Sequence, residues 1–154
     1  MPGDQGACNA WSAAPLRDTA CPMSQENVEI VRRAIDAYNR RDVETLQALN
    51  HPDVEIDWSA SVGPHPQIYR GQEEAADFYN SLIGTFERVH LIPDRFIESG
   101  DAVVVPNSAE VRGRDGIQTV ARSTLVYEVR DGRIARVRLY QETAEALEAV
   151  GLRN

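Results

Sequence analysis

Apolar and polar residues alternate along the last third of the chain. Residues 122–129 (RSTLVYEV) and 134–140 (IARVRLY) each repeat with a period of two, which is typical of half-buried β-strands. Asp131 and Gly132 lie between the two runs, and an Asp-Gly pair favours a two-residue turn in which both residues have positive φ. The pattern therefore predicts a long hairpin. Helical spacing at residues 143–152 predicts a short C-terminal helix after it.

Helical spacing dominates the first half of the chain. The apolar residues spaced three or four apart are Val28, Val31, Ile35 and Tyr38. This spacing predicts a helix of about four turns, with Ser24 as its candidate N-cap. Asp42 is the candidate cap of a second, short helix, which His51 and Pro52 end. The apolar residues of the second helix are Val43, Leu46 and Leu49.

A strand, a loop and a third helix are predicted next. Val54, Ile56 and Trp58 alternate with acids, which indicates a strand. Residues 59–70 contain the stretch GPHP at 63–66, which indicates a loop, either a plain surface loop or a lid. The third helix has a broad apolar face that must pack against a sheet. Its apolar residues are Ala75, Phe78, Tyr79, Leu82, Ile83 and Phe86.

From His90 onward, turns separate segments of period two and predict a four-stranded antiparallel meander. The turns lie at residues 99–101, 113–116 and 131–132. Pro106 falls inside one strand, and because proline has no N–H we expect an edge or a bulge there. Helices followed by a meander predict an α+β domain.

Composition restricts the function. With 154 residues, 42% hydrophobic and 26% charged, the chain has room for one domain with a core of its own. The net charge of −8 and the scattered basic residues argue against a nucleic-acid partner. No apolar run is long enough to predict a membrane span, and we expect a cytoplasmic protein.

The first 22 residues differ from the rest in being rich in Ala, Gly and Pro without periodicity. We expect a disordered tail over residues 1–22 and one domain over residues 23–154, with Met23 as an alternative start. Both cysteines, Cys8 and Cys21, fall in the tail. A structural disulfide or a zinc cluster is therefore not expected in the domain.

The order and spacing of several motifs carry a resemblance that extends over residues 24–152. The motifs are AYNRRD at Ala37–Asp42 with Leu46 and Leu49, PDVEIDW at Pro52–Trp58, YRG at Tyr69–Gly71, VRDGRI at Val129–Ile134 and EALEAVGL at Glu145–Leu152. Together they resemble the SnoaL-like family of the nuclear transport factor 2-like (NTF2-like) superfamily. The resemblance implies a cone-shaped curved antiparallel sheet packed against three N-terminal helices. It also implies a conical pocket and a homodimer formed through the outer sheet face.

A shared fold does not imply a shared reaction, so each known activity of the superfamily requires its own acid/base residues in this chain. The ketosteroid isomerase branch uses a tyrosine and two acids, and those positions align with Ala34, Leu125 and Trp58. The limonene epoxide hydrolase branch has an aspartate where this chain has Leu139. The polyketide cyclase branch has an acid/base aspartate in the region that corresponds to Arg122–Leu125, and this chain has no carboxylate there. All three acid/base sets are absent by this alignment.

If Leu125 and Leu139 face the pocket, strand alternation adds neighbouring residues to the same wall. An apolar wall with few polar groups suits a small, largely apolar organic molecule, although the same residues would also fill an ordinary core. Tyr69 and Arg122 could add hydrogen bonds near the mouth. The predicted ligand-binding residues are Trp58, Tyr79, Tyr38, Ser123, Leu125, Tyr127, Val137 and Leu139.

Catalytic and metal-binding candidates are few. Glu110 is a weak catalytic candidate, because alternation from Pro106 and Ser108 could turn it inward, where burial would raise the pKa of its carboxyl. Glu55 and Asp57 alternate with the apolar side of their strand and are expected to be surface acids. The three histidines, His51, His65 and His90, are isolated, so no metal and no cofactor are expected.

The sequence thus predicts a SnoaL-like domain that binds a small, largely apolar organic molecule and that could act on it as an isomerase, cyclase or hydratase with an unidentified acid/base. The alternative is a non-catalytic carrier or a dimeric interaction module. That alternative would use the outer sheet face, where Arg136, Arg138 and Tyr140 are expected.

Overall fold

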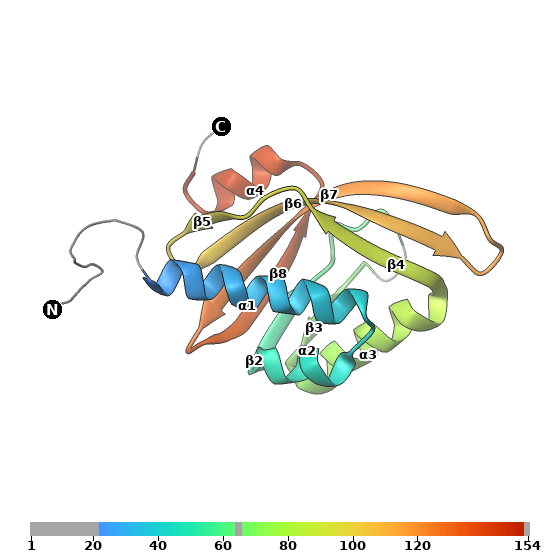
Figure 1. Ribbon diagram of the computed structural model, residues 1–154, viewed down its shortest axis with the longest axis horizontal. Coiled ribbons are helices and arrows are strands. Elements are labelled where there is room, and N and C mark those ends of the chain that lie inside the picture. The colour runs from blue at the N-terminus through green and yellow to red at the C-terminus, as the bar shows by residue number, and fades with distance from the viewer. Residues whose placement is uncertain (1–21, 64–65, 153–154) are drawn as a thin grey trace, which may run out of the picture.

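The structure is a computed structural model that describes residues 22–63 and 66–152 (Figure 1). The helices are α1 (Pro22–Asn39), α2 (Val43–Leu49), α3 (Gly71–Thr85) and α4 (Thr143–Ala149). The strands are β2 (Asn50–Asp57), β3 (Ile68–Arg70), β4 (Phe86–Pro93), β5 (Ile97–Ser99), β6 (Ala102–Gly113), β7 (Gln118–Arg130) and β8 (Arg133–Tyr140). The predicted tail lies outside the described residues except for Pro22, at which α1 begins, two residues before the predicted cap Ser24.

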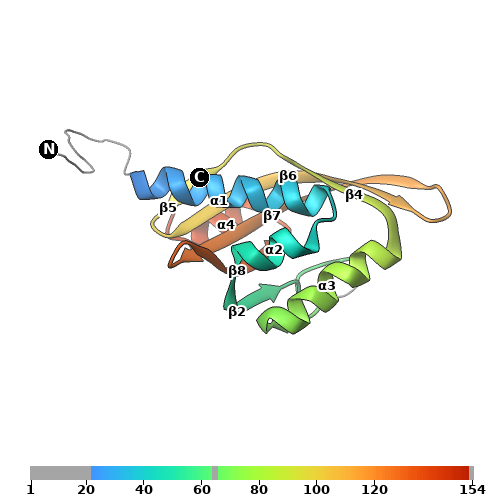
Figure 2. The same ribbon diagram turned by 60° about the horizontal axis from the view of Figure 1, so that its bottom comes forward.

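The predicted N-terminal helices are confirmed. Val31 and Ile35 of α1 are buried, as the spacing predicts. Asp42 caps α2, because its carboxylate accepts hydrogen bonds from the backbone N–H and the hydroxyl of Thr45, at 3.0 and 2.7 Å. In α3 the buried residues lie on one face, and Phe86, predicted as part of this helix, is the first residue of β4 instead. Figure 2 shows α1 and α2 in front of the sheet, with α3 below them in this view.

One curved sheet has the strand order β3-β2-β8-β7-β6-β4, with β5 also paired to β6. The predicted meander is present, and the β7–β8 hairpin turns through Asp131 and Gly132 with φ of 55° and 74°. One pair departs from the expected antiparallel arrangement, because β2 runs parallel to β8. The sheet is therefore mixed. Alternation specifies which face of β2 is buried but not the direction of its partner.

The first strand of the meander is interrupted. β4 pairs with residues 107–113 of β6 and β5 with residues 102–104, and the chain between them leaves the ladder. Pro106 lies at this interruption, where it has no N–H to donate and its carbonyl accepts from the backbone N–H of Asp94 at 2.8 Å. The irregularity predicted at Pro106 therefore lies in the strand paired with β6, which is divided into β4 and β5. β6 itself keeps an unbroken register with β7.

Both faces of the sheet carry a core. Val103 and Val105 of β6 pack on the inner side with α1, α2 and α3. Val104 and Val126 point the other way and pack with Ala146 and Leu147 of α4 on the outer side. The β6–β7 hairpin extends beyond the helices in Figure 1, and one end of the inner face therefore stays uncovered.

Candidate functional site

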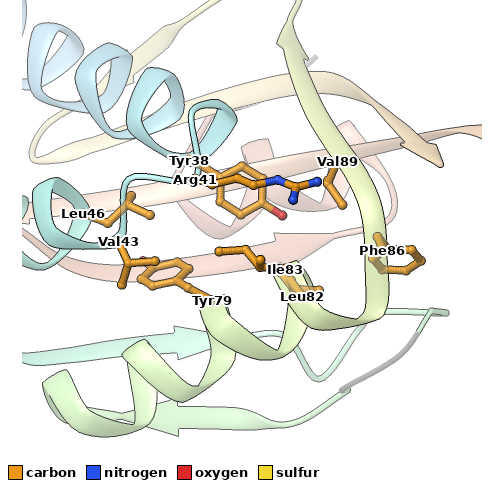
Figure 3. Close-up of a pocket in the computed structure, with 9 residues that line it drawn as sticks. All are labelled: Tyr38, Arg41, Val43, Leu46, Tyr79, Leu82, Ile83, Phe86 and Val89. Atoms are coloured by element: carbon orange, nitrogen blue, oxygen red, sulfur yellow. The ribbon is translucent and has the colours of Figure 1, made fainter. Parts of the chain in front are cut away.

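A hollow of about 330 Å³ lies between the inner face of the sheet and the ends of α1 and α3. A deeper hollow of about 40 Å³ continues inward and shares Tyr38, Trp58, Leu91 and Leu125 with it. A third, of about 20 Å³, lies between α2, α3 and β4, and Figure 3 shows its lining residues with Tyr38 and Arg41 side by side. Tyr38 borders all three hollows, so we describe them together as the cavity.

Every predicted ligand-binding residue lines this cavity. Ser123 and Leu139 border the wide hollow, and Tyr79, Tyr127 and Val137 border the deeper one. The residues that border both are Tyr38, Trp58 and Leu125. The structure brings these eight residues together from five elements or their ends, and whether they bind a ligand stays a prediction.

The strand parity assumed in the sequence comparison is confirmed. Ala34, Trp58, Leu125 and Leu139, which align with functional positions of other branches, all border the cavity. If the alignment were wrong by one residue, the strand positions it identified would lie on the opposite face of the sheet. The aligned positions therefore face the cavity with apolar side chains, which cannot transfer a proton.

Aromatic side chains form the floor of the cavity. Phe78 is 2% exposed, and its ring centroid lies 5.0 Å from that of Trp58, 4.7 Å from that of Tyr69 and 5.6 Å from that of Tyr79. Tilted contacts of this kind hold the rings in fixed orientations. Tyr69 is buried in this cluster and does not border the cavity, so it does not supply the hydrogen bond predicted for it near the mouth.

Three tyrosine hydroxyls border the deeper hollow, namely those of Tyr38 of α1, Tyr79 of α3 and Tyr127 of β7. Burial raises the pKa of Tyr127, and the nearby hydroxyls of Tyr79 and Tyr38 raise it further. Burial also raises the pKa of Tyr38, with a further increase from Tyr79 and an opposing effect of Arg41. All three side chains are therefore neutral hydrogen-bond donors at neutral pH.

Glu110 lies outside the cavity. In β6 it alternates with Ala109 and Val111, which border the wide hollow, and it is paired in register with the exposed Val120 of β7. Because the register of β6 is unbroken, Glu110 faces the outer side of the sheet. The prediction of an inward acid at this position is wrong.

Asp57 points away from the cavity as predicted, but it is not a surface acid, because only 6% of it is exposed. Burial alone would raise the pKa of its carboxyl. Hydrogen bonds from the Ser59 hydroxyl (2.6 Å) and backbone (3.1 Å), with the charges of Arg138 and Arg136, outweigh burial and lower that pKa. Glu55 pairs with Arg136 at 3.2 Å in the same cluster. Asp57 therefore stabilises the outer face.

Arg122 was predicted near the mouth, and it borders the wide hollow. Its guanidinium, however, is held on the outer side by an ion pair with Asp94 and a hydrogen bond of 2.6 Å to the hydroxyl of Ser108. Residues 118–123 of β7 pair with β6 alone, since pairing with β8 begins at Thr124. The side chain of Arg122 is therefore already engaged away from the cavity.

Several wall residues were missed by the sequence analysis. Ala109, Val111, Thr119 and Ala121 line the wide hollow from the β6–β7 hairpin. The alternation that predicted Ser123 would also have identified Thr119 and Ala121. Asn50 borders the deeper hollow, and no local pattern indicated it because it lies where α2 ends and β2 begins.

The described residues contain no group of three or more His, Cys, Asp or Glu side chains that could hold a metal ion. His65 lies outside the described residues, and the Nδ1 of His51 accepts from the backbone N–H of Asp53 at 3.1 Å. Among residues 22–63 and 66–152, no helix is long and apolar enough to cross a membrane.

The sequence profile of the SnoaL-like domain matches residues 31–137. A search of proteins with curated functions found no match. An NTF2-like protein of unknown function from Burkholderia pseudomallei has a similar fold, with a TM-score of 0.66 and 24% identity over 82% of this chain and 98% of that one.

Two further structures contain a small molecule. TerC, co-crystallised with polyporic acid, has a TM-score of 0.68 and 24% identity over 81% of this chain and 97% of its own. A Mycobacterium tuberculosis protein in complex with estradiol-17β-hemisuccinate has a TM-score of 0.67 and 20% identity over 76% of this chain and 94% of its own. At these identities the three structures show the fold alone. Because the profile covers most of the chain, this protein belongs to the SnoaL-like family, and it has the NTF2-like fold.

Proposed function

We propose that this protein binds a small, largely apolar organic molecule in the cavity between the sheet and the helices. The observation that supports this most strongly is the open hollow of about 330 Å³, whose wall is mainly apolar and aromatic. Pockets of this size with a few polar groups are typical of small-molecule sites. Two proteins of the same fold have been crystallised with small organic molecules, namely polyporic acid and estradiol-17β-hemisuccinate.

Binding without proton transfer by the protein is favoured over an isomerase, cyclase or hydratase activity. No carboxylate or imidazole borders any of the three hollows among the described residues. Such groups are the usual general acids and bases. The hydroxyls and amides that do border the cavity can orient a ligand by hydrogen bonding.

Thermal denaturation with a panel of lipophilic small molecules tests this proposal. Ala121→Trp should fill the wide hollow, and Val120→Trp, on the opposite face of the same strand, is the matched control. We expect at least one compound to raise the melting temperature of the wild type and of Val120→Trp but not of Ala121→Trp. If no compound stabilises the protein, or if Ala121→Trp responds equally, the proposal is wrong.

We also propose that the protein is a homodimer formed through the outer sheet face. Arg136, Arg138 and Tyr140 lie on this face as predicted, each partly exposed, with the guanidinium of Arg138 over the Tyr140 ring at 5.0 Å. Their aliphatic and aromatic surfaces can contribute to an interface. Sedimentation velocity should give twice the mass of one chain, and a monomer at all concentrations would contradict the dimer.

A further inference from the structure

We propose that Tyr38, Tyr79 and Tyr127 form a hydrogen-bond donor site for a carbonyl oxygen, so that the ligand of this cavity is an apolar carbonyl compound. This inference rests on the proposed function and adds the chemical class of the ligand. It depends on where the three hydroxyls lie and on which hydrogen bonds they already make.

The three tyrosines come from separate elements and border the same deeper hollow. The rings of Tyr38 and Tyr79 meet edge to face, with centroids 6.5 Å apart. Tyr127 approaches from the sheet, and the hydroxyls of Tyr38 and Tyr79 are close enough to raise its pKa. Three phenol groups therefore converge at the inner end of an apolar cavity.

The hydrogen bonds within the protein leave donors free. The Asn50 side-chain amide donates to the Tyr79 hydroxyl at 3.2 Å, so this hydroxyl accepts one bond and keeps its own proton to donate. Within the part of the chain that the structure describes, the hydroxyls of Tyr38 and Tyr127 make no hydrogen bond. Neither hydroxyl oxygen is among the fully buried polar atoms that lack a partner, so both are accessible and can donate to a ligand that supplies an acceptor oxygen.

The surroundings of these hydroxyls select a carbonyl. The deeper hollow is bordered by no carboxylate or imidazole among the described residues, and most of its wall is hydrocarbon. A carbonyl oxygen accepts two hydrogen bonds and donates none, which matches neutral phenol donors in an apolar enclosure. Since burial keeps the tyrosines protonated, these donors persist at neutral and mildly alkaline pH.

This donor set occupies other positions than the oxyanion-binding pair of the ketosteroid isomerase branch. Ala34 and Leu125 occupy the positions that align with the oxyanion-binding pair of the ketosteroid isomerase branch, and both are apolar here. Tyr38 lies about one helical turn beyond Ala34 on α1, and Tyr127 lies two residues beyond Leu125 on β7. The hydroxyl donors of this chain therefore lie on the same two elements but at different positions.

A matched pair of probes tests the inference, namely 1-tetralone and tetralin, which share a fused ring and differ by one carbonyl. Isothermal titration calorimetry gives both affinities for the wild type, Tyr38→Phe and Tyr127→Phe. Tyr140→Phe, on the outer face, is the control, because Tyr140 does not border the cavity. The infrared stretching frequency of the bound carbonyl reports hydrogen bonding directly, which a purely structural role would leave unchanged.

We expect the wild type and Tyr140→Phe to bind 1-tetralone about tenfold more tightly than tetralin, as expected for one or two neutral hydrogen bonds. Tyr38→Phe and Tyr127→Phe should each reduce this preference about three- to tenfold, leave tetralin affinity unchanged and raise the carbonyl stretching frequency. Equal affinities for the two probes in every variant would overturn the inference and leave the proposed function intact. If neither probe binds to the folded wild type, both the carbonyl inference and the proposed function are contradicted.

Discussion

The side-chain amide of Asn50 donates a hydrogen bond of 3.2 Å to the hydroxyl of Tyr79. Asn50 ends α2 and begins β2, whereas Tyr79 lies on α3, and both are buried. The backbone carbonyl of Asn50 also accepts from the Gln72 side chain at 3.0 Å. One asparagine therefore joins two helices and the first strand at the inner end of the cavity.

Removing this asparagine should destabilise the fold. Asn50→Ala leaves the buried Tyr79 hydroxyl without its donor, and we expect the free energy of unfolding to fall by about 1–3 kcal/mol. Urea denaturation measures this change. Because the two side chains interact, Asn50→Ala combined with Tyr79→Phe should cost less than the sum of the single variants. Strict additivity would show that the bond contributes nothing to stability.

Asp57 should make stability depend on pH below about pH 4. Its pKa is lowered in the folded protein, whereas an unfolded aspartate has a pKa of about 3.9. Its contribution is therefore fully present above that value and is lost as the pH falls through the lowered folded pKa. We expect Asp57→Asn to be less stable than the wild type at neutral pH, with a difference that shrinks in acid.

Urea denaturation between about pH 8 and pH 2.5 would measure the Asp57 effect. Asp53→Asn, an exposed acid of the same strand, is the control and should change stability little at any pH. A difference between wild type and Asp57→Asn that stays constant in acid would refute the role assigned to Asp57.

The aromatic floor of the cavity should be sensitive to Phe78. Phe78→Ala removes a buried ring that contacts Trp58, Tyr69 and Tyr79, and we expect a loss of about 3–5 kcal/mol in unfolding free energy. Phe78→Leu should cost less, because it leaves a smaller void. Tryptophan emission in a Trp11→Phe background should shift in Phe78→Ala as Trp58 loses a packing partner. An unchanged spectrum and stability would argue against this cluster.

Two glycines should respond to alanine in opposite ways. Gly132 has a φ of 74° in the β7–β8 turn, so Gly132→Ala should lower the free energy of unfolding by about 1 kcal/mol. Gly84 lies within α3 at an ordinary φ with open space around it, so Gly84→Ala should raise stability by about 0.5–1 kcal/mol. Guanidinium denaturation of both variants provides the comparison. Destabilisation by Gly84→Ala would contradict the expected packing at that position.

Local sequence determined most of the secondary structure. The spacing of Val31 and Ile35, the Asp42 cap and the Asp131–Gly132 turn each act within a few residues, so a pattern in the chain is sufficient to predict them. The same alternation placed Leu125, Tyr127 and Val137 on one wall, because successive strand residues point to opposite faces. Family resemblance then supplied the reason to expect a hollow beside that wall.

Tertiary structure alone decided which distant residues meet. Asp57 is buried because Arg136 and Arg138 of β8 lie beside it, and β8 lies there because β2 joins the sheet in parallel. Glu110 faces outward because β6 keeps its register past Pro106. The convergence of tyrosines from α1, α3 and β7 likewise depends on packing between segments far apart in sequence. Periodicity specifies the face of an element, whereas burial, partners and enclosed volume arise only when those faces are packed together.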